Sequence, residues 1–505
     1  MVAEELLSLP FPLPLAVLLV GSLVVPLISI LSGKRGTPGA RSYWALLVSS
    51  LTLASIYVLY TQLLAAKNNI LLFHIWGQQP PLGGSFEVDM LGLFMAFSIS
   101  FLGLLVTIYT ISYMKSEQRL TEFYSLLLLA MAGMMGVVFA GDMLTLFVFW
   151  EMMSITSYVL VAFMKDNWRG IEAGFKYLIM SSMAGAFILL SMSFLYGLTG
   201  SLNFAALAST LKGAPLSPWF VLLFAAVIIG FGVKSAIVPL HTWLPDAYSE
   251  APDPISALLA GIATETALFA LIRILYLVFD PSVFMIPVAV FAVATMSLGN
   301  ILALRQDDLK RLLAYSSIAQ IGYMLIGVST GLAYGLFGVF LHIFNNSLMK
   351  GMAFLAAGNI THQTGQRNIN NMQGLVKVMP ITTISLTIAL LGLGGVPGTN
   401  GFISKFVLLS SAIGANLSIL AVIGVINVAI SMAYYLRVVM TLLNGKAPND
   451  SGRKEAPLLM VGVIAFMAVL IVVLGIFPNP ILGFASDASN SLLSGLNNYI
   501  GAVLG

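Results

Sequence analysis

The sequence predicts an all-α integral membrane protein with about 14 transmembrane helices. Of its 505 residues, 59% are hydrophobic and only 9% are charged, whereas about 25% of the residues in soluble domains are charged. Apolar runs of roughly 18 to 25 residues recur from end to end, and each can cross about 30 Å of hydrocarbon as a helix. The composition leaves no room for a soluble domain, so we expect a multi-pass protein of the cell membrane.

The apolar runs give the expected helices in order. They cover residues 12–31, 43–63, 88–112, 123–140, 143–163, 173–197, 217–240, 254–279, 283–304, 311–329, 333–358, 380–411, 415–440 and 457–477. A polar stretch at 441–456 is expected to be a loop before the last helix.

The basic residues are sorted between the two sides of the membrane. Alternate loops and helix ends hold 17 of the 23 Lys and Arg, and the opposite set holds only Lys67 and Lys212. Loops rich in Lys and Arg stay in the cytoplasm. We therefore predict that both termini lie on the outer side, which agrees with an even number of helices.

Several classes of function are excluded by the residues that the chain lacks. It has no Cys, and its four His are scattered at 74, 241, 342 and 362, so thiolate metal sites, iron–sulfur clusters and a paired-His haem site are not expected. No phosphate-binding GxxxxGK[ST] loop is present. We expect no cofactor, no metal and no nucleic acid, in a chain that moves something without hydrolysing ATP or carrying electrons itself.

Ionisable residues stand in the middle of the apolar runs. Such residues cost about 2.5–3.5 kcal/mol each at the bilayer centre and usually face a protein interior or a wet cavity. One of them alone is readily explained as a structural ion pair or a snorkelling side chain. Together they predict a proton relay, in which neighbouring acids and bases titrate in a coupled way. The set is Glu151, Lys234, Glu265, His342, Lys350 and Lys405.

Other polar residues support or border this relay. His342, Asn346 and Lys350 fall at i, i+4 and i+8, which places them on one face of a helix. Arg273 lies near a helix end, where snorkelling explains it better. Asp89 and Asp142 stand at the ends of runs and are interpreted as solvated helix caps.

Two runs are interrupted by helix breakers close to a lysine. The seventh contains Gly230, Gly232, Lys234 and Pro239, and the twelfth contains Gly392, Gly395, Pro397, Gly401 and Lys405. Broken helices in corresponding positions mark the transport sites of inverted-repeat carriers, although close packing and kinks are the simpler alternative. The five-helix offset fits helices 1–3 in residues 1–120, a first repeat of helices 4–8 in 121–280, a second repeat of helices 9–13 in 281–440, and a loop with helix 14 in 441–505.

Four long motifs carry a family resemblance. They read GDMLTLFVFWEMMSITSYVLV around Glu151, KSAIVPLHTWLPDAYSEAPDPISALLAG from Lys234, RLLAYSSIAQIGYM from Arg311, and GTNGFISKF to Lys405. They resemble the antiporter-like, proton-translocating subunits of respiratory complex I, of Mrp-type sodium/proton antiporters (the D-type subunit) and of membrane-bound hydrogenases. The match covers nearly the whole chain, most clearly residues 85 to 440.

The resemblance implies a 14-helix fold with two inverted five-helix repeats and broken helices 7 and 12. It implies that Glu151 tunes Lys234 in the input half-channel, that His342 and Lys350 belong to the central hydrophilic axis, and that Lys405 ends the exit half-channel. Weaker supporting roles fall to His241, Asn346, Ser316, Ser317 and Tyr323.

The chain departs from the family pattern at two positions. Glu265 stands where relatives commonly have Lys, and Asn346 where many have a second His. A carboxylate in place of an ammonium reverses the local charge, which puts the usual lysine-to-lysine transfer in doubt. We expect Glu265 to carry protons, or to contribute to a sodium site with Thr264 and Thr266.

Three functions are compatible with the sequence. The leading hypothesis is an ion-translocating subunit, not catalytic alone, that works with other membrane subunits, further antiporter-like subunits and a peripheral redox arm or an opposing sodium gradient. The alternatives are a self-sufficient cation/proton antiporter and a quinone-binding membrane subunit of an oxidoreductase.

Overall fold

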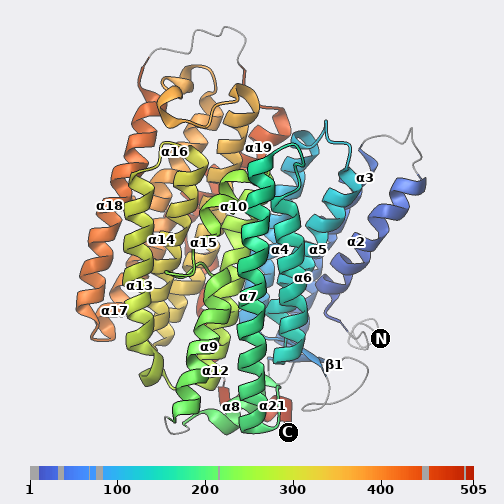
Figure 1. The fold of residues 1–505 in the computed structure, drawn as a ribbon, viewed down its shortest axis with the longest axis vertical. Coiled ribbons are helices and arrows are strands. Elements are labelled where there is room, and N and C mark those ends of the chain that lie inside the picture. The colour runs from blue at the N-terminus through green and yellow to red at the C-terminus, as the bar shows by residue number, and fades with distance from the viewer. Residues whose placement is uncertain are drawn as a thin grey trace.

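A bundle of long helices that run roughly in one direction forms most of the chain (Figure 1). The computed structural model describes residues 11–31, 39–66, 69–74, 84–213, 217–445, 454–493 and 496–504. Among these residues, eleven helices are long and apolar enough to cross a membrane, and two further apolar helices are shorter. The predicted multi-pass, helical fold class is confirmed. Lys67 and residues 446–453 of the loop predicted at 441–456 lie outside the described residues, and residues 441–443 of that predicted loop belong to a helix.

The helices follow the predicted order. The N-terminal part contains α2 (Leu13–Leu31), α3 (Ala40–Ala65), α4 (Met90–Tyr113), α5 (Leu120–Phe139), α6 (Met143–Val161), α7 (Trp168–Thr199), α8 (Phe204–Leu211), α9 (Pro218–Lys234), α10 (Leu244–Glu250), α11 (Asp253–Leu258) and α12 (Thr264–Val278). The C-terminal part contains α13 (Pro281–Leu304), α14 (Leu309–Ser329), α15 (Ala333–Thr364), α16 (Pro380–Gly394), α17 (Asn400–Gly414), α18 (Ser418–Leu443), α19 (Leu458–Ile476), α20 (Asn479–Leu493) and α21 (Leu496–Leu504). Two single 3-10 turns, Ile369–Asn371 and Leu375–Lys377, connect α15 to α16.

Several short elements were not predicted. Strands β1 (Leu71–His74) and β2 (Ser85–Val88) form an antiparallel hairpin just before α4. Helices α8, α20 and α21 also lie outside the expected runs. The hairpin, α8 and α21 gather at one end of the bundle, the lower end in Figure 1.

The seventh expected helix ends at its lysine. Helix α9 stops at Lys234, a stretch of turns follows, and α10 begins at Leu244. Ala236 adopts a positive φ of 53°, a conformation that an α-helix does not contain. Pro239 has no N–H for a helical hydrogen bond. The break therefore lies where the sequence predicts it.

The twelfth expected helix is divided into α16 and α17. Gly395 and Gly398 have φ values of 82° and 88°, which glycine adopts without steric cost. Pro397 lacks the N–H that would bond the carbonyl of Leu393 four residues earlier. A freed carbonyl inside a membrane needs a partner from elsewhere in the protein, and here that partner is Lys405.

The eighth expected helix is continuous but not regular. Helix α11 passes into a π-helical turn, η2 (Leu259–Ala263), and then into α12. A π-turn is rare and occurs mostly at functional sites. In this chain the π-turn ends at Ala263, and Glu265 follows as the second residue of α12.

Burial divides the bundle into a centre and a rim. The span that contains α11, η2 and α12 is entirely buried, as is nearly all of α14, whereas only about a third of α2 and α13 is buried. The rim helices expose Leu, Ile, Val and Phe side chains, as expected for contact with lipid. The ionisable residues of the predicted relay lie in the central helices or in helices packed against them.

Candidate functional site: a buried line of charged and polar side chains

Lys234 ends α9 with its ammonium held between α6 and α7. Its side chain is 1% exposed. Its Nζ donates a hydrogen bond of 2.6 Å to Ser154 Oγ and lies 5.4 Å from the ring centroid of Trp150 and 5.8 Å from that of Tyr177. One hydroxyl and two ring faces are weak partners for a buried charge, so the site does not tie the lysine to one protonation state.

Glu151 lies one turn before Ser154 on α6. Its Oε1 has no hydrogen-bond partner, and it packs so closely on Gly185 of α7 that a Cβ there would lie 2.7 Å away. Glu151 and Lys234 act on each other electrostatically. Their charged atoms nevertheless form no ion pair within 4.0 Å, because the lysine contacts Ser154. The two residues are therefore coupled electrostatically, through space.

The Glu265 side chain, which extends from α12, contacts α15. Its side chain is 2% exposed, and its Oε1 accepts a hydrogen bond of 2.6 Å from Asn346 Nδ2. Its Oε2 and the Oδ1 atom of Asn346 have no partner. Buried polar atoms are nearly always hydrogen-bonded, so two free oxygen atoms at one contact mark a site that accepts a proton or a cation.

Lys350 lies one turn after Asn346 on α15 and points to α14. Its Nζ donates to the carbonyl oxygen of Leu313 at 2.9 Å and to Ser316 Oγ. The ammonium is also close enough to Glu265 for the two charges to interact. The hydroxyl of Tyr435 on α18 also interacts with Ser316. Thus Lys350 connects the acid on α12 to polar groups on α14 and α18.

His342 lies two turns before Lys350, and both ring nitrogens have partners. Nδ1 is 2.8 Å from Ser404 Oγ on α17, and Nε2 is 3.1 Å from Gln320 Oε1 on α14. Gln320 Nε2 then donates to the carbonyl oxygen of Leu393 at 3.2 Å and lies 3.5 Å from the hydroxyl of Tyr435. The histidine is completely buried.

Lys405 on α17 supplies the partner of the carbonyl that the break sets free. Its Nζ donates a hydrogen bond of 2.5 Å to the Leu393 oxygen and lies 4.4 Å from the ring centroid of Tyr323. The hydroxyl of Tyr323 lies 3.4 Å from Asn300 Nδ2. Asn300 is in turn hydrogen-bonded to Asn427 and to Tyr434. Polar groups therefore continue from Lys405 toward α13 and α18.

The first and second halves of this line are separated by aromatic rings. Tyr177 stacks on Trp243, with centroids 4.0 Å apart and planes 8° apart, and Trp243 meets Tyr248 edge to face at 6.1 Å. The Tyr248 hydroxyl contacts Thr264 Oγ1, next to Glu265. The rings thus span the region between Lys234 and Glu265.

The residues predicted to support the relay differ in what their side chains contact. Ser316, Asn346 and Tyr323 contact relay residues in the structure. Ser317 and Thr266 use their hydroxyls to bond carbonyls of their own helices. His241 lies in the break after α9, and its Nδ1 has no partner. Three further residues contact the line and were not predicted from the sequence, although each is a polar residue within an apolar run: Gln320, Ser404 and Tyr435.

Arg273 does not snorkel, so that interpretation is wrong. Its side chain is 2% exposed, and its Nη2 lies 3.2 Å from Asp89 Oδ2 and 3.8 Å from Glu87 Oε2. Its partners come from the hairpin and the start of α4, which sequence position alone does not bring near α12. Asp89 and Asp142 do cap α4 and α6, but both caps are buried and not solvated.

Glu87 has an unusual environment in this cluster, outside the membrane-spanning segments. Its side chain is fully buried in β2, its Oε2 accepts a hydrogen bond of 2.5 Å from Tyr499 on α21, and its Oε1 has no partner. Burial raises the pKa of Glu87 to about 8, against the opposing effect of Arg273. Glu87 therefore holds its proton at neutral pH and joins the hairpin to α21.

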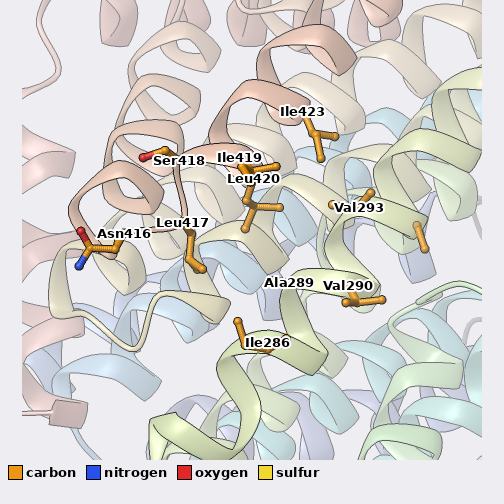
Figure 2. A pocket seen from close by; sticks show the side chains of 11 residues that line it. Ile286, Ala289, Val290, Val293, Asn416, Leu417, Ser418, Ile419, Leu420 and Ile423 are labelled. Atoms are coloured by element: carbon orange, nitrogen blue, oxygen red, sulfur yellow. The ribbon is translucent and has the colours of Figure 1, made fainter.

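The described surface also has an apolar groove away from the relay. Figure 2 shows it between α13 and the start of α18, with a volume of about 520 Å³. Its lining includes Val290, Val293, Leu420 and Ile423 and none of the relay residues. Among the described residues, no three His, Cys, Asp or Glu side chains gather in a way that could hold a metal ion.

Comparison with known families gives two matches. The family described as NADH:quinone oxidoreductase/Mrp antiporter, TM, matches residues 140–431, and the family described as NADH-ubiquinone oxidoreductase (complex I), chain 5 N-terminus, matches residues 81–124. The first match contains all six ionisable residues of the predicted relay.

Individual proteins agree with these matches. The chain is 35% identical to NADH-quinone oxidoreductase subunit N of Desulforudis audaxviator over 416 residues, which are 80% of this chain and 83% of the relative. It is 31% identical to F(420)H(2) dehydrogenase subunit N of Methanosarcina mazei over 484 residues, which are 92% of this chain and 96% of the relative.

Solved structures share the fold. A chain of the membrane-bound sulfane sulfur reductase, an archaeal respiratory membrane complex, matches with a TM-score of 0.88 at 27% identity over 99% of both chains. A chain of respiratory complex I from Thermus thermophilus matches with a TM-score of 0.77 at 26% identity over 94% of this chain and 100% of the other. A chain of the Mrp complex from Dietzia has a TM-score of 0.88 at 23% identity over 98% and 100%, which shows the fold alone. The protein belongs to the NADH:quinone oxidoreductase/Mrp antiporter family, as an antiporter-like membrane subunit of a multisubunit complex.

Proposed function

We propose that this subunit moves protons across the membrane along the buried line of ionisable residues. The observation that supports this most is the set of contacts between Lys350 and Lys405. From Lys350, polar groups continue through Ser316, Tyr435 and Gln320 to the Leu393 carbonyl, which accepts hydrogen bonds from both Gln320 and Lys405. These groups form a continuous buried polar lining between the two lysines, in which the Gln320 amide and the Leu393 carbonyl hold their neighbours in place and do not themselves carry the proton.

The remaining couplings are electrostatic. Glu151 acts on Lys234 without touching it, and Glu265 acts on Lys350 in the same way. In a low-dielectric interior, a change of charge at one of these groups strongly alters the proton affinity of its neighbour. A change of protonation at Glu151 and Lys234 therefore affects Glu265 and Lys350 through the electrostatic potential, whereas protons themselves move only within each half of the line.

Glu265 gives this chain a distinctive centre. A carboxylate attracts a proton toward Lys350, whereas a lysine at this position would repel it. Its free Oε2 provides the place where that proton binds. Asn346 holds the other oxygen and keeps the carboxylate in position.

Further assignments belong to the same proposal. Helices 4–8 (residues 121–280) and 9–13 (residues 281–440) form two repeats, which is supported by the break after α9 and the break between α16 and α17. Both termini lie on the outer side of the cell membrane. The ion pairs Lys176–Asp246, Arg311–Asp246 and Lys310–Asp253 then lie at the cytoplasmic end, in agreement with the distribution of basic residues.

The complex is proposed to be a respiratory one in which redox chemistry elsewhere drives this subunit. The two relatives described above are named as N subunits of oxidoreductases. Their names describe parts of larger assemblies, which does not favour a self-sufficient carrier. The partners are then other membrane subunits, including further antiporter-like ones, and a peripheral redox arm.

The test uses the intact complex in proteoliposomes with a pH-sensitive dye. We expect Lys234→Ala and Glu151→Ala each to leave assembly unchanged and to reduce proton translocation per turnover at least tenfold, because general acid–base groups contribute about 10²–10⁴-fold. Lys212→Ala, outside the line, serves as the control and keeps wild-type transport. Normal gradient formation in the first two variants would contradict the proposal, as would transport that depends on Na⁺ and leaves the pH unchanged.

A further inference from the structure

Gln320 connects the two ends of the second half-line and has no role assigned so far. It is fully buried on α14. Its Oε1 faces His342 Nε2 at 3.1 Å, and its Nε2 faces the Leu393 oxygen at 3.2 Å. The same Leu393 oxygen accepts the hydrogen bond from Lys405. One amide group therefore contacts the histidine directly and the lysine through one shared atom.

The orientation of this amide follows from the break in the twelfth helix. Pro397 has no N–H, so the Leu393 carbonyl has no helical partner and is free to accept hydrogen bonds from side chains. A carbonyl oxygen only accepts. The NH₂ end of Gln320 must therefore face Leu393, which leaves Oε1 to face the histidine.

The amide orientation in turn fixes the histidine. An amide oxygen also only accepts, so Nε2 of His342 must carry a hydrogen to bond with it. A neutral imidazole has a single N–H, and the hydrogen bond made by one nitrogen decides which nitrogen keeps it. The opposite tautomer would place two acceptors 3.1 Å apart. Nδ1 is then the nitrogen with the free lone pair, and it faces Ser404 at 2.8 Å.

We propose that Gln320 is a positioning residue that holds neutral His342 as the Nε2–H tautomer, so that the ring gains and loses its transported proton at Nδ1, through Ser404. In the neutral state the Ser404 hydroxyl donates to Nδ1. When water delivers a proton to Ser404 Oγ, the hydroxyl hydrogen that faced Nδ1 passes to that nitrogen, so the hydroxyl keeps one hydrogen in total; Nδ1 then becomes the donor, and Ser404 accepts from it. Its own hydrogen then turns to the carbonyl oxygen of Gly401, which lies 3.3 Å from Ser404 Oγ.

This arrangement gives the two faces of the His342 ring different roles. The face toward Ser404 on α17 exchanges the proton at Nδ1. The face toward Gln320 keeps its hydrogen throughout. The transport part of the inference rests on the proposed function, whereas the tautomer does not.

The tautomer is tested by nuclear magnetic resonance on the intact complex labelled with histidine carrying ¹⁵N at Nδ1 only. The His342 signal is identified by its loss in His342→Gln, and the spectrum is recorded at a pH where the ring is neutral. We expect Nδ1 to be unprotonated in the wild type and to become partly protonated in Gln320→Leu. A protonated Nδ1 in the wild type, or an unchanged signal in Gln320→Leu, would overturn the positioning role of Gln320.

The route is tested by transport. We expect Ser404→Ala to slow proton translocation at least tenfold and Ser404→Thr, which keeps a hydroxyl, to retain most of it. Ser411→Ala is the matched control, because Ser411 is buried on the same helix and its hydroxyl bonds only the Leu408 carbonyl. Wild-type transport by Ser404→Ala would overturn the route. If Lys234→Ala also transports normally, the proposed function fails with it, while the tautomer result still stands by itself.

Discussion

Replacing Glu265 with glutamine separates the charge of this residue from its hydrogen bond. In Glu265→Gln, the side-chain oxygen still accepts the bond from Asn346 Nδ2, which measures 2.6 Å in the wild type. The new NH₂ group takes the place of the Oε2 atom, which has no partner to lose. What disappears is the negative charge and the ability to bind a proton.

The expected effects on stability and transport differ in size. Because the hydrogen bond remains, we expect the free energy of unfolding to change by about 1 kcal/mol or less. Glu265→Ala, in contrast, leaves Asn346 unpaired and costs about 1–3 kcal/mol. Transport by Glu265→Gln should fall at least tenfold, because an acid–base group contributes about 10²–10⁴-fold.

A second substitution restores the carboxylate on the opposite helix. In Glu265→Gln combined with Asn346→Asp, the amide and the acid change places across the same contact. We expect this double variant to recover part of the lost transport, because a titratable group again lies within reach of Lys350.

Both steps are measured with the assembled complex in proteoliposomes, as initial rates of dye quenching at equal turnover. Glu122→Gln, in the first turn of α5 and outside the line, is the control for loss of a carboxylate. Wild-type transport by Glu265→Gln would refute the idea that Glu265 carries a proton. A double variant no faster than the single one would show that position, and not only charge, decides the transfer.

Three other outcomes are expected. Ser154→Ala should slow transport about tenfold with unchanged assembly, because Lys234 loses the one hydrogen-bond partner it has among the described residues; an unchanged rate would contradict this role of Ser154. Arg273→Met should lower the free energy of unfolding by about 3 kcal/mol, since removing one member of a buried ion pair leaves Asp89 uncompensated, and an unchanged midpoint of thermal unfolding in detergent would contradict a stabilising role for this ion pair. Raising the pH from 5 to 9 should lower the midpoint of thermal unfolding, because the pKa of Glu87 is about 8 in the folded protein and its ordinary value is 4.5. Between these two pH values the folded state binds more protons than the unfolded state, so it loses about 1.4 kcal/mol of stability per pH unit as the pH rises. Glu87→Gln should make the midpoint less dependent on pH, and an equally steep dependence in the variant would assign it to other groups.

Much of the fold was predictable because lipid imposes simple rules on sequence. Long apolar runs predict the helices. Pro239 and Pro397, with neighbouring residues, predict the breaks, because proline has no N–H and water in a bilayer cannot hydrogen-bond the carbonyl that is left without a partner. The short hairpin was missed because its strands contain only four residues each. Its pairing depends on contacts that periodicity does not reveal.

The site was predictable where a residue is conspicuous by its charge. Glu265 and Lys350 stand out in apolar runs, and each is buried as expected. Gln320 and Ser404 do not stand out, because neutral polar residues are common in membrane helices and bond their own backbone in many cases. Only the fold shows that both meet His342, although 22 and 62 residues separate them from it.

Under the proposed function, the stacked rings between Lys234 and Glu265 have a consequence for energy conservation. The faces of Tyr177 and Trp243 offer no hydrogen that exchanges along the stack, so in that mechanism they block the leakage of protons. An electric field passes through them, because aromatic groups screen charge far less than water does. The rings would therefore let the charge at Lys234 influence Glu265 electrostatically while no proton crosses between the two halves of the line.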